Sequence, residues 1–574
     1  MQQIVILGGG AAGLAAALAA AQSAPAGAVR VTVLDRNPRC GKKLLATGNG
    51  RCNLDNTGIA PEQYFTADPA ALRPLLAAVD AAAPLEWFAA LGLYTRTDEA
   101  GRVYPYSNQA ADVLALLEGH LARLGVEVRT GCTVQTLSQN RSGYTILCED
   151  AEGQDQTLRA DAVICAMGGN AGPQFGTDGF GTRFAAQCGG KLEPLYPCLT
   201  ALQTAKPNRS LAGIRAKAAA TLLDLDRHCT VAVENGEVQF TDYGLSGICI
   251  MQLSGHLAPG RGPKRPAVEL DLFPMLDETA LTALFAARVP LLPGKAPADF
   301  WTGLLNPKLG RALWAAAKLP EKPVDTLPDA AWQVLANAAK HWLFEGLTPC
   351  GWKQAQTTGG GLSLTEVTPS FQFKGCPGLY FVGETLDCAG SCGGFNLHWA
   401  FGSGLAAGQT AAVIGDGTIG LMTLIAAKSQ GAQVCISGHH TRPMQLAAQL
   451  GALDCAQLPQ LTAERGADVV YDAVGSQSSF TQAMELVRKG GRIMVIGNHA
   501  RTIDFPLQRC ITEQIDVQFS YSSAGEYPVC LQAIAEGRAG LTGLWQSFPL
   551  AEGAQVFDRL VHRDESLTKA VLIP

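Results

Sequence analysis

The sequence has few charged residues and no excess of positive ones. Only 16% of the 574 residues are charged, and 44 Lys and Arg stand against 50 Asp and Glu, which gives a net charge of −6. This balance provides no basic face suited to nucleic acid or to an anionic membrane, so neither is an expected partner. Hydrophobic residues make up 47%, which indicates a globular chain long enough for three or four domains.

Ordered cysteine patterns and long apolar runs are also missing. The 17 cysteines include no Cys-x2-Cys pair, which argues against a disulfide framework or a zinc cluster and favours reduced thiols in the cytoplasm. Cys388 and Cys392 have Cys-x3-Cys spacing, but no neighbouring His or Cys cluster completes a tetrahedral site, so no metal is expected. The apolar stretch 4–21 lacks the basic region of a secretion signal, and no other stretch reads as a membrane span.

A dinucleotide-binding fingerprint stands at the start of the chain. "IVILGGGAAGLAAALAAA", from Ile4, predicts a buried strand, the turn Gly8-x-Gly10-x-x-Gly13 and an Ala-rich helix. The glycines allow the turn, the approach of backbone to a pyrophosphate and close helix packing, and the helix N-terminus favours the phosphate charge. "VRVTVLDRN" adds a second strand ending at Asp35, whose carboxylate can accept ribose hydroxyls. The alternative is a glycine turn in an ordinary α/β unit.

Further motifs carry a family resemblance. "CGKKLLATGNGRCNLDN" suits a loop that offers N–H groups and cations to an anionic ligand, although a solvated surface loop has similar composition. The motifs that agree with it in order are "GRVYPYSNQAADVL" at 101–114, "FTDYGLSGICIMQLS" at 240–254, "TTGGGLSL" at 357–364 and "GLYFVGETLDCAGSCGGFNLHWAFGSGLAAG" at 378–408. Together they resemble a bacterial FAD-dependent flavoprotein family that includes a 3-dehydro-bile-acid Δ4,6-reductase, over residues 1–408.

The resemblance implies an FAD site in which 378–408 returns to complete the fold. A helix that begins at Gly394 can place N–H groups and partial positive charge against the flavin pyrimidine. Met167 stands where the family usually has Thr, and an acidic residue and a proline common near Ala389 and Ser391 are absent, which weakens the transfer of substrate specificity. The expected FAD-binding residues are Gly8, Gly10, Ala12, Gly13, Asp35, Arg36, Lys43, Gly48, Gly50, Arg51, Asn53, Val134, Gly168, Gly169, Gly383, Glu384, Gly394, Phe395 and Asn396.

The predicted secondary structure changes in the middle of the chain. "AAATLLDL" and "CTVAVENGEVQFT" suggest antiparallel strands with a turn at Asn235-Gly236, and helices are expected around 278–288 and 308–318. This pattern is similar to the strand-plus-helix insert with which the family covers the flavin, and a substrate cleft at the domain junction would suit it. The expected domains are 1–189 and 353–408 for FAD, 190–352 for the insert, and 409–574 for a second nucleotide.

A second fingerprint begins near Gly408 with no linker before it. "GQTAAVIGDGTIGLMTLIAAKSQGAQVCISG", "ADVVYDAVGS" and "GGRIMVIG" resemble the cofactor domain of zinc-type medium-chain alcohol and polyol dehydrogenases over 408–574, and predict a doubly wound parallel sheet. The catalytic zinc domain of those enzymes has no counterpart in the sequence. No carboxylate stands near Gly438, which favours NADP over NAD. The expected nucleotide-binding residues are Gly415, Gly417, Ile419, Gly420, Ser437, His439 and Arg442, with Gly475 and Gly497.

These features predict an FAD-dependent NAD(P)H oxidoreductase. NAD(P)H would reduce the flavin, whose N5 would pass hydride to an activated C=C of a small molecule. The expected C=C is of the enone type. Candidate proton donors are Arg51, Cys52, Tyr104 and Tyr106, and nothing in the sequence selects among them. The alternative is a fusion protein whose C-terminal domain only binds a nicotinamide nucleotide, or is a dehydrogenase remnant without catalysis of its own.

Overall fold

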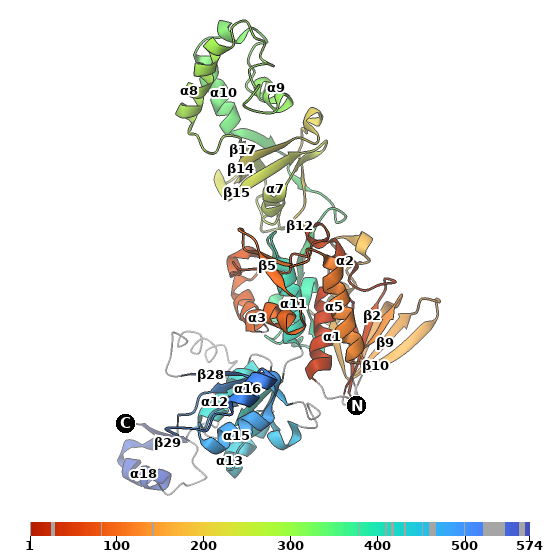
Figure 1. Cartoon of the computed structure of the whole chain (residues 1–574), viewed down its shortest axis with the longest axis vertical. Coiled ribbons are helices and arrows are strands. Elements are labelled where there is room, and N and C mark those ends of the chain that lie inside the picture. The colour runs from red at the N-terminus through yellow and green to blue at the C-terminus, as the bar shows by residue number, and fades with distance from the viewer. Residues whose placement is uncertain are drawn as a thin grey trace.

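The computed structural model describes residues 2–23, 29–81, 83–140, 143–376, 378–407, 410–414, 418–429, 432–450, 452–458, 466–498, 500–520, 546–561 and 569–573. The first parallel sheet lies in the middle of the molecule, the inserted sheet and its helices lie at one end, and the second parallel sheet lies at the other end (Figure 1). No helix in these ranges combines the length and apolar character that crossing a membrane requires.

The first sheet is parallel and has the strand order β21-β11-β1-β2-β7. The fingerprint forms β1 (Gln2–Leu7), α1 (Ala11–Ser23) and β2 (Val29–Asp35), and Ile4 pairs with both Val31 and Ala162. The remaining strands are β7 (Glu127–Thr130), β11 (Ala162–Cys165) and β21 (Leu379–Phe381). Strand β21 follows β11 by more than 200 residues, so a distant segment completes the sheet, as the family resemblance implies.

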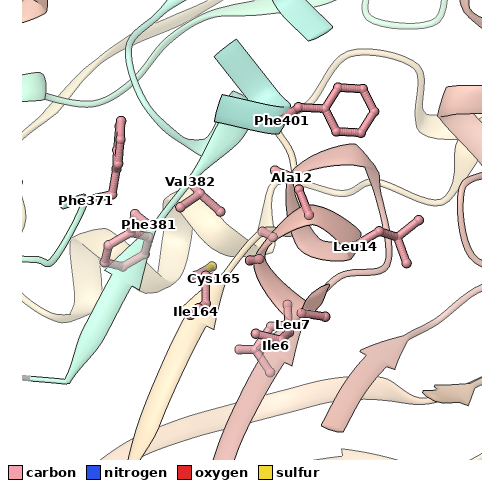
Figure 2. Close-up of a cluster of buried hydrophobic side chains, with 14 of the residues drawn as sticks. Ile6, Leu7, Ala12, Leu14, Ile164, Cys165, Phe371, Phe381, Val382 and Phe401 are labelled. Atoms are coloured by element: carbon pink, nitrogen blue, oxygen red, sulfur yellow. The ribbon is translucent and has the colours of Figure 1, made fainter. Parts of the chain in front are cut away.

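Helix α11 (Phe395–Ala406) packs along α1 at very short range. A Cβ on Gly404 would overlap the carbonyl oxygen of Ala12, so glycine is needed where the helices cross. Phe401, Ala12 and Leu14 lie in the same apolar cluster as Ile6, Leu7, Ile164, Cys165, Phe381 and Val382 (Figure 2). The first and last segments of residues 1–407 therefore share one core.

Several smaller elements surround this sheet. Helix α5 (Ala110–Arg123) packs beside α1, and α3 (Pro69–Ala81) packs against α11. The others are α2 (Lys42–Ala46), β3 (Asp55–Asn56), β4 (Tyr64–Phe65), α4 (Pro84–Ala90), β5 (Thr95–Thr97), β6 (Arg102–Pro105), β8 (Thr133–Asn140), β9 (Gly143–Glu149), β10 (Asp155–Ala160), α6 (Phe180–Gln187), β12 (Leu192–Cys198), β20 (Thr357–Leu362) and β22 (Ala389–Gly390).

The insert contains a seven-stranded antiparallel sheet covered by helices. Its strand order is β18-β17-β14-β15-β16-β13-β19. The strands are β13 (Leu202–Gln203), β14 (Arg215–Asp224), β15 (Cys229–Phe240), β16 (Gly244–Ser246), β17 (Pro266–Asp271), β18 (Trp342–Glu345) and β19 (Thr348–Pro349). The helices are α7 (Ile248–Ser254), α8 (Glu278–Arg288), α9 (Pro307–Ala316) and α10 (Ala330–Lys340), of which α8 and α9 lie where the sequence predicts them.

The turn predicted at Asn235-Gly236 is wrong. Both residues lie inside β15, where they pair with Ala219 and Ala218, and β14 instead connects to β15 through residues 225–228. Gly236 sits where the backbone approaches α7, because a Cβ there would lie 3.4 Å from the Cβ of Cys249. Glycine inside a strand can mark such a close approach rather than a turn.

The second parallel sheet has six strands in the order β25-β24-β23-β26-β27-β28. Numbered by their sequence within this sheet, the strands run 3-2-1-4-5-6, the order of a dinucleotide-binding fold. Its strands are β23 (Thr410–Ile414), β24 (Gln433–Ser437), β25 (Leu453–Asp454), β26 (Ala467–Asp472), β27 (Val487–Val495) and β28 (Asp516–Phe519). Its helices include α12 (Thr418–Ser429), α13 (Thr441–Gln449), α15 (Gln477–Leu486), α16 (Leu507–Glu513) and α18 (Gly553–Val561). The predicted α/β class with two such folds is confirmed.

Candidate functional site

The glycines of the first fingerprint hold a turn against a cavity. Gly8 has a φ of 100°, and its N–H donates to the Leu34 carbonyl at 2.8 Å. A Cβ on Gly13 would overlap the Gly8 carbonyl oxygen, whereas a Cβ on Gly10 would meet no protein atom within 4 Å. Gly8 and Gly13 therefore shape the turn, and Gly10 leaves space beside it.

This space is a cavity of about 130 Å³ at the end of β1 and β2. Seven of the predicted FAD-binding residues line it, namely Gly8, Gly10, Asp35, Arg36, Lys43, Val134 and Gly168. Helix α1 begins at Ala11 beside it, and the first turn of a helix has N–H groups without intrahelical partners. The glycine-lined space and the helix start fit the diphosphate of a dinucleotide.

The carboxylate of Asp35 is tied to the turn. Its Oδ2 accepts from the Gly9 N–H at 2.8 Å, and its Oδ1 accepts from the Asn37 N–H at 2.7 Å. Oδ1 also accepts from the Asn37 Nδ2 at 3.0 Å, so the remaining lone pair is on Oδ2. Asp35 can therefore hold the turn and still accept a ribose hydroxyl.

A second loop, which the sequence analysis did not predict, closes over the same cavity. Thr177 and Asp178 line it, and Asp178 forms an ion pair with Arg36 at 2.9 Å. The Asn37 Nδ2 donates to the Phe175 carbonyl at 3.1 Å, and a Cβ on Gly176 would overlap the side chain of Asn37. The only available signal was the density of glycines in "GPQFGTDGFG".

Lys43 and Glu384 join the loop after β2 to the return segment. The Lys43 Nζ lies 2.5 Å from the Glu384 Oε2 and donates to the Ala171 carbonyl at 3.1 Å. The Glu384 Oε1 accepts from the hydroxyl of Thr358 at 2.7 Å. Gly169 packs against Thr358, where a Cβ would overlap that side chain. The charge of Lys43 is thus balanced within the protein.

The loop at residues 47–53 holds an unusual backbone and an unpaired acceptor. Gly48, Asn49 and Cys52 have φ values of 56°, 57° and 59°, and Gly50 has 82°. Left-handed residues other than glycine are uncommon and cluster at functional sites. The Oδ1 of Asn53 is buried and has no hydrogen-bond partner. A buried acceptor without a partner suits a ligand that brings an N–H donor, as a flavin ring does.

The N-terminus of α11 lies beside this loop. Gly394 has a φ of 110°, and a Cβ there would overlap the carbonyl oxygen of Asp55 and lie 3.0 Å from the Oδ1 of Asn53. The side-chain amide of Asn396 accepts from the Gly390 N–H at 2.9 Å and donates to its carbonyl at 2.7 Å. The backbone of Phe395 accepts from the Tyr64 hydroxyl at 3.3 Å. Asn396 therefore fixes the segment before the helix.

Gly383 and Ala12 lie deeper, under the same helix. The Gly383 N–H donates to the Ser403 hydroxyl at 3.0 Å, and its carbonyl accepts from the Trp399 indole at 3.1 Å. A Cβ on Gly383 would lie 2.9 Å from that of Ala12. Both polar groups of the Gly383 backbone are thus engaged by α11.

His398 is a site feature that the sequence analysis missed. It is 4% exposed, its Nδ1 lies 3.0 Å from Asp55, and its Nε2 lies 3.1 Å from Asp80. Nδ1 is not aligned for a hydrogen bond, so the Asp55 contact is an ion pair. Burial favours the neutral ring, but the two carboxylates outweigh it and raise the pKa of His398 from 6.5 to about 9. Only side-chain packing could have revealed this, because Asp55 and Asp80 are distant in the sequence.

The four candidate proton donors differ in exposure. Tyr106 is 72% exposed and Arg51 is exposed, whereas Tyr104 is 4% exposed and Cys52 is fully buried. Burial raises the pKa of the Cys52 thiol to about 12. Arg51 lies over the ring of Tyr104 at 5.1 Å from its centroid. The structure thus brings Arg51 and Tyr104 into contact and leaves Cys52 shielded from solvent.

The predicted nicotinamide-nucleotide site is partly described. Gly415 and Gly417 lie outside the described residues. Gly420 is buried in the first turn of α12, with Ile419 half-exposed beside it. A Cβ on Gly475 would overlap the Gly497 carbonyl oxygen, so the two loops touch.

The end of β24 carries the residues expected to select the nucleotide. Ser437 accepts from the side-chain amide of Gln482 at 2.9 Å, and His439 and Arg442 are exposed. In the part of the chain that is described, no group of His, Cys, Asp and Glu residues could hold a metal ion.

Comparison with known proteins identifies relatives of both parts of the chain. Residues 2–410 match the family model described as HI0933-like protein Rossmann domain, and residues 418–536 match the one described as zinc-binding dehydrogenase. The two resemblances expected from the sequence motifs are confirmed.

Two of the relatives align over nearly their whole length. The 3-dehydro-bile acid delta(4,6)-reductase of Clostridium scindens is 38% identical over 416 residues, 72% of this chain and 99% of the reductase. The ribosomal RNA dihydrouridine synthase of Escherichia coli is 26% identical over 407 residues, 71% of this chain and 96% of the synthase. Sorbitol dehydrogenase of Bacillus subtilis is 26% identical over 152 residues, 25% of this chain and 43% of that enzyme. The chain thus spans less than half of this dehydrogenase.

Proposed function

Because this chain belongs to the HI0933-like Rossmann-domain family, we propose that it is an FAD-dependent NAD(P)H oxidoreductase that reduces an activated C=C of a small molecule. The observation that carries the proposal is the cavity at Gly10, where glycines and the start of α1 leave space for a diphosphate. The similarity to a reductase named for a bile acid substrate supports the type of reaction. Residues 1–189 and 353–408 would form the FAD domain and 190–352 its cover.

The chain's own groups would bind FAD through backbone and a few side chains. The N–H groups in the first turn of α1 would bind the diphosphate, and the carboxylate of Asp35 would accept a hydrogen bond from a ribose hydroxyl. The Asn53 Oδ1 and the N-terminus of α11 would lie at the ring, since both surround Gly394. FAD, when bound, would supply hydride transfer to the substrate carbon.

A proton must reach the reduced substrate from the side chains around loop 47–53. Tyr106 and Arg51 are accessible to solvent, whereas Cys52 is buried with a raised pKa and Tyr104 is covered. Because the donor must approach the substrate, we favour Tyr106 over Cys52. The planar guanidinium of Arg51 would bind an anionic group of the substrate rather than donate the proton.

The C-terminal unit would bind NADP(H) in preference to NAD(H). The end of β24 carries Ser437, His439 and Arg442 and no carboxylate that would repel a 2′-phosphate. The alternative is that this unit binds a nucleotide without contributing to the reaction. Replacing Arg442 with Ala should weaken NADPH binding and leave NADH binding unchanged. If NADPH reduces the flavin of Arg442→Ala at the same rate as that of the unaltered protein, the alternative is favoured, in which the C-terminal unit does not contribute to the reaction.

A pair of glycine variants tests FAD binding. Gly10→Ala adds a Cβ into open space, so it should purify without FAD and have the same melting temperature as the unaltered protein stripped of FAD. Gly13→Ala forces a clash with the Gly8 carbonyl and should lower both the melting temperature and the flavin content. Absorbance at 450 nm relative to 280 nm measures the flavin. Full retention of FAD by Gly10→Ala would contradict the proposed site.

The reaction itself is tested with the whole protein. NADPH should bleach the flavin absorbance anaerobically, and a cyclic enone should restore it. If the flavin absorbance recovers when uridine-containing RNA is added and does not recover with any enone tested, the activity would instead resemble that of the ribosomal RNA dihydrouridine synthase.

A further inference from the structure

A short hairpin beside loop 47–53 carries aromatic and cationic side chains on one face. Strands β5 and β6 are antiparallel, and Arg96 lies opposite Tyr104. The ladder continues by one further bond, from the Tyr106 N–H to the Tyr94 carbonyl at 2.8 Å. Side chains two residues apart on a strand share a face. Tyr94, Arg96, Tyr104 and Tyr106 therefore point to the same side, which we call the hairpin face.

The hairpin face is exposed and positively charged. Tyr94 is 82% exposed and Tyr106 is 72% exposed. The guanidinium groups of Arg51 and Arg96 lie 5.1 Å and 5.7 Å from the centroid of the Tyr104 ring. Among the described residues neither is ion-paired with a carboxylate, and Arg96 instead donates to the neutral side-chain oxygen of Asn108 at 2.5 Å. Two cations held on one ring without a counter-charge favour an anion beside them.

The tip end of the hairpin face is electrically balanced, since Arg102 and Asp98 are two residues from Tyr104 and Arg96 and lie on the same face. Arg102 on β6 forms an ion pair with Asp98 at 2.8 Å. Asp98 and Glu99 stand at the tip of the hairpin, where their charges would repel a long polyanion. The local charge pattern thus suits a ligand with one anionic group rather than a nucleic acid chain.

The hairpin adjoins the proposed flavin site directly. The Leu54 N–H donates to the Val103 carbonyl at 2.8 Å, which joins loop 47–53 to β6. The Arg51 Nε donates to the Gly48 carbonyl at 3.1 Å. The Asn56 Nδ2 donates to the Gly393 carbonyl at 2.8 Å, one residue before the N-cap of α11. A molecule on the hairpin face would therefore lie next to the glycines expected at the ring.

We propose that the hairpin face binds the apolar, planar body of an acidic substrate, with its carboxylate or sulfate held by Arg51 and Arg96. Tyr94 and Tyr106 provide flat surfaces for stacking, and planar guanidinium groups suit a carboxylate. This inference rests on the proposed function, because it names the class of substrate for the same site.

The test uses a fluorescent probe that cannot accept hydride, so binding is measured apart from turnover. Pyrenebutyrate and the uncharged pyrenebutanol are titrated into the FAD-loaded protein and their Kd values compared. We expect the acid to bind about ten-fold more tightly, which corresponds to about 1.4 kcal/mol. Arg96→Gln should reduce this ratio to about two-fold, and Tyr94→Ala should weaken both probes. Arg129→Gln, which removes an exposed arginine paired with Glu127 on β7, should leave the ratio unchanged.

Three results would overturn the inference. The first is equal binding of acid and alcohol to the unaltered protein, and the second is a ratio that survives in Arg96→Gln. The third is displacement of the acid by single-stranded oligouridylate with a steep salt dependence, which would assign the face to nucleic acid. Flavin content and bleaching by NADPH are recorded on the same samples. A protein that holds and reduces FAD but fails these binding tests would refute the substrate class alone.

Discussion

Replacing His398 with Gln tests how the helix at the proposed flavin site is held. A group whose pKa is higher in the folded state stabilises it fully below the unfolded pKa. That stability is lost as the pH rises through the folded pKa. For His398 the pKa is 6.5 in the unfolded state and about 9 in the folded state. At about 1.36 kcal/mol per pKa unit, the imidazolium contributes about 3 kcal/mol at pH 6 and less than about 0.5 kcal/mol at pH 9.5.

The assay is urea unfolding followed by flavin release, at steps from pH 6 to pH 9.5. The free energy of unfolding of the unaltered protein should exceed that of His398→Gln by about 3 kcal/mol at pH 6. This difference should fall toward zero at pH 9.5. Groups that titrate in both proteins cancel in this difference. His256→Gln is the matched control, because burial lowers the pKa of His256 and leaves it uncharged over most of this range. A His398→Gln difference that does not change with pH would refute the ion-pair account.

Further variants examine the closing loop, the Lys43 pair and metal content. Gly176→Ala should displace Asn37 and speed FAD dissociation several-fold, measured by stopped-flow fluorescence, and an unchanged rate would separate this loop from the cofactor. Lys43→Met leaves the half-buried Glu384 unpaired and should cost about 1–2 kcal/mol of stability, part of which Lys43→Met/Glu384→Gln should recover. Dialysis against a chelator should leave flavin content and NADPH oxidation unchanged, since the proposed flavin site uses backbone groups and side chains and no metal. Loss of flavin or of NADPH oxidation, together with release of one zinc ion per chain, would contradict the expectation of a metal-free protein.

Local chain chemistry was sufficient to predict the two parallel sheets. The glycine fingerprints combine a strand, a turn and a helix within about 30 residues, and each part is readable from adjacent positions. Helices α8 and α9 follow apolar periodicity in the same way. The turn at Asn235-Gly236 failed because the pairing of β15 with β14 and the approach of α7 outweighed a local preference.

The site was less accessible to prediction where it depends on distant segments. Gly10 and Asp35 line one cavity and lie in one continuous motif, which is why the sequence could propose them together. The ion pair between Arg36 and Asp178 joins residues more than 140 positions apart, and the His398 contacts join more distant ones. Such pairs become visible only when the sheet and α11 bring them together.

The position of α11 bears on the order in which the two nucleotide folds can form. Its crossing with α1 at Gly404 and Ala12 lies three residues before Ala407, and the chain still packs on the first core at Leu405, Ala406 and Ala407. On the ribosome, the N-terminal unit can therefore finish folding while the second is still being synthesised. The second nucleotide fold can then form beside a neighbour that is already folded.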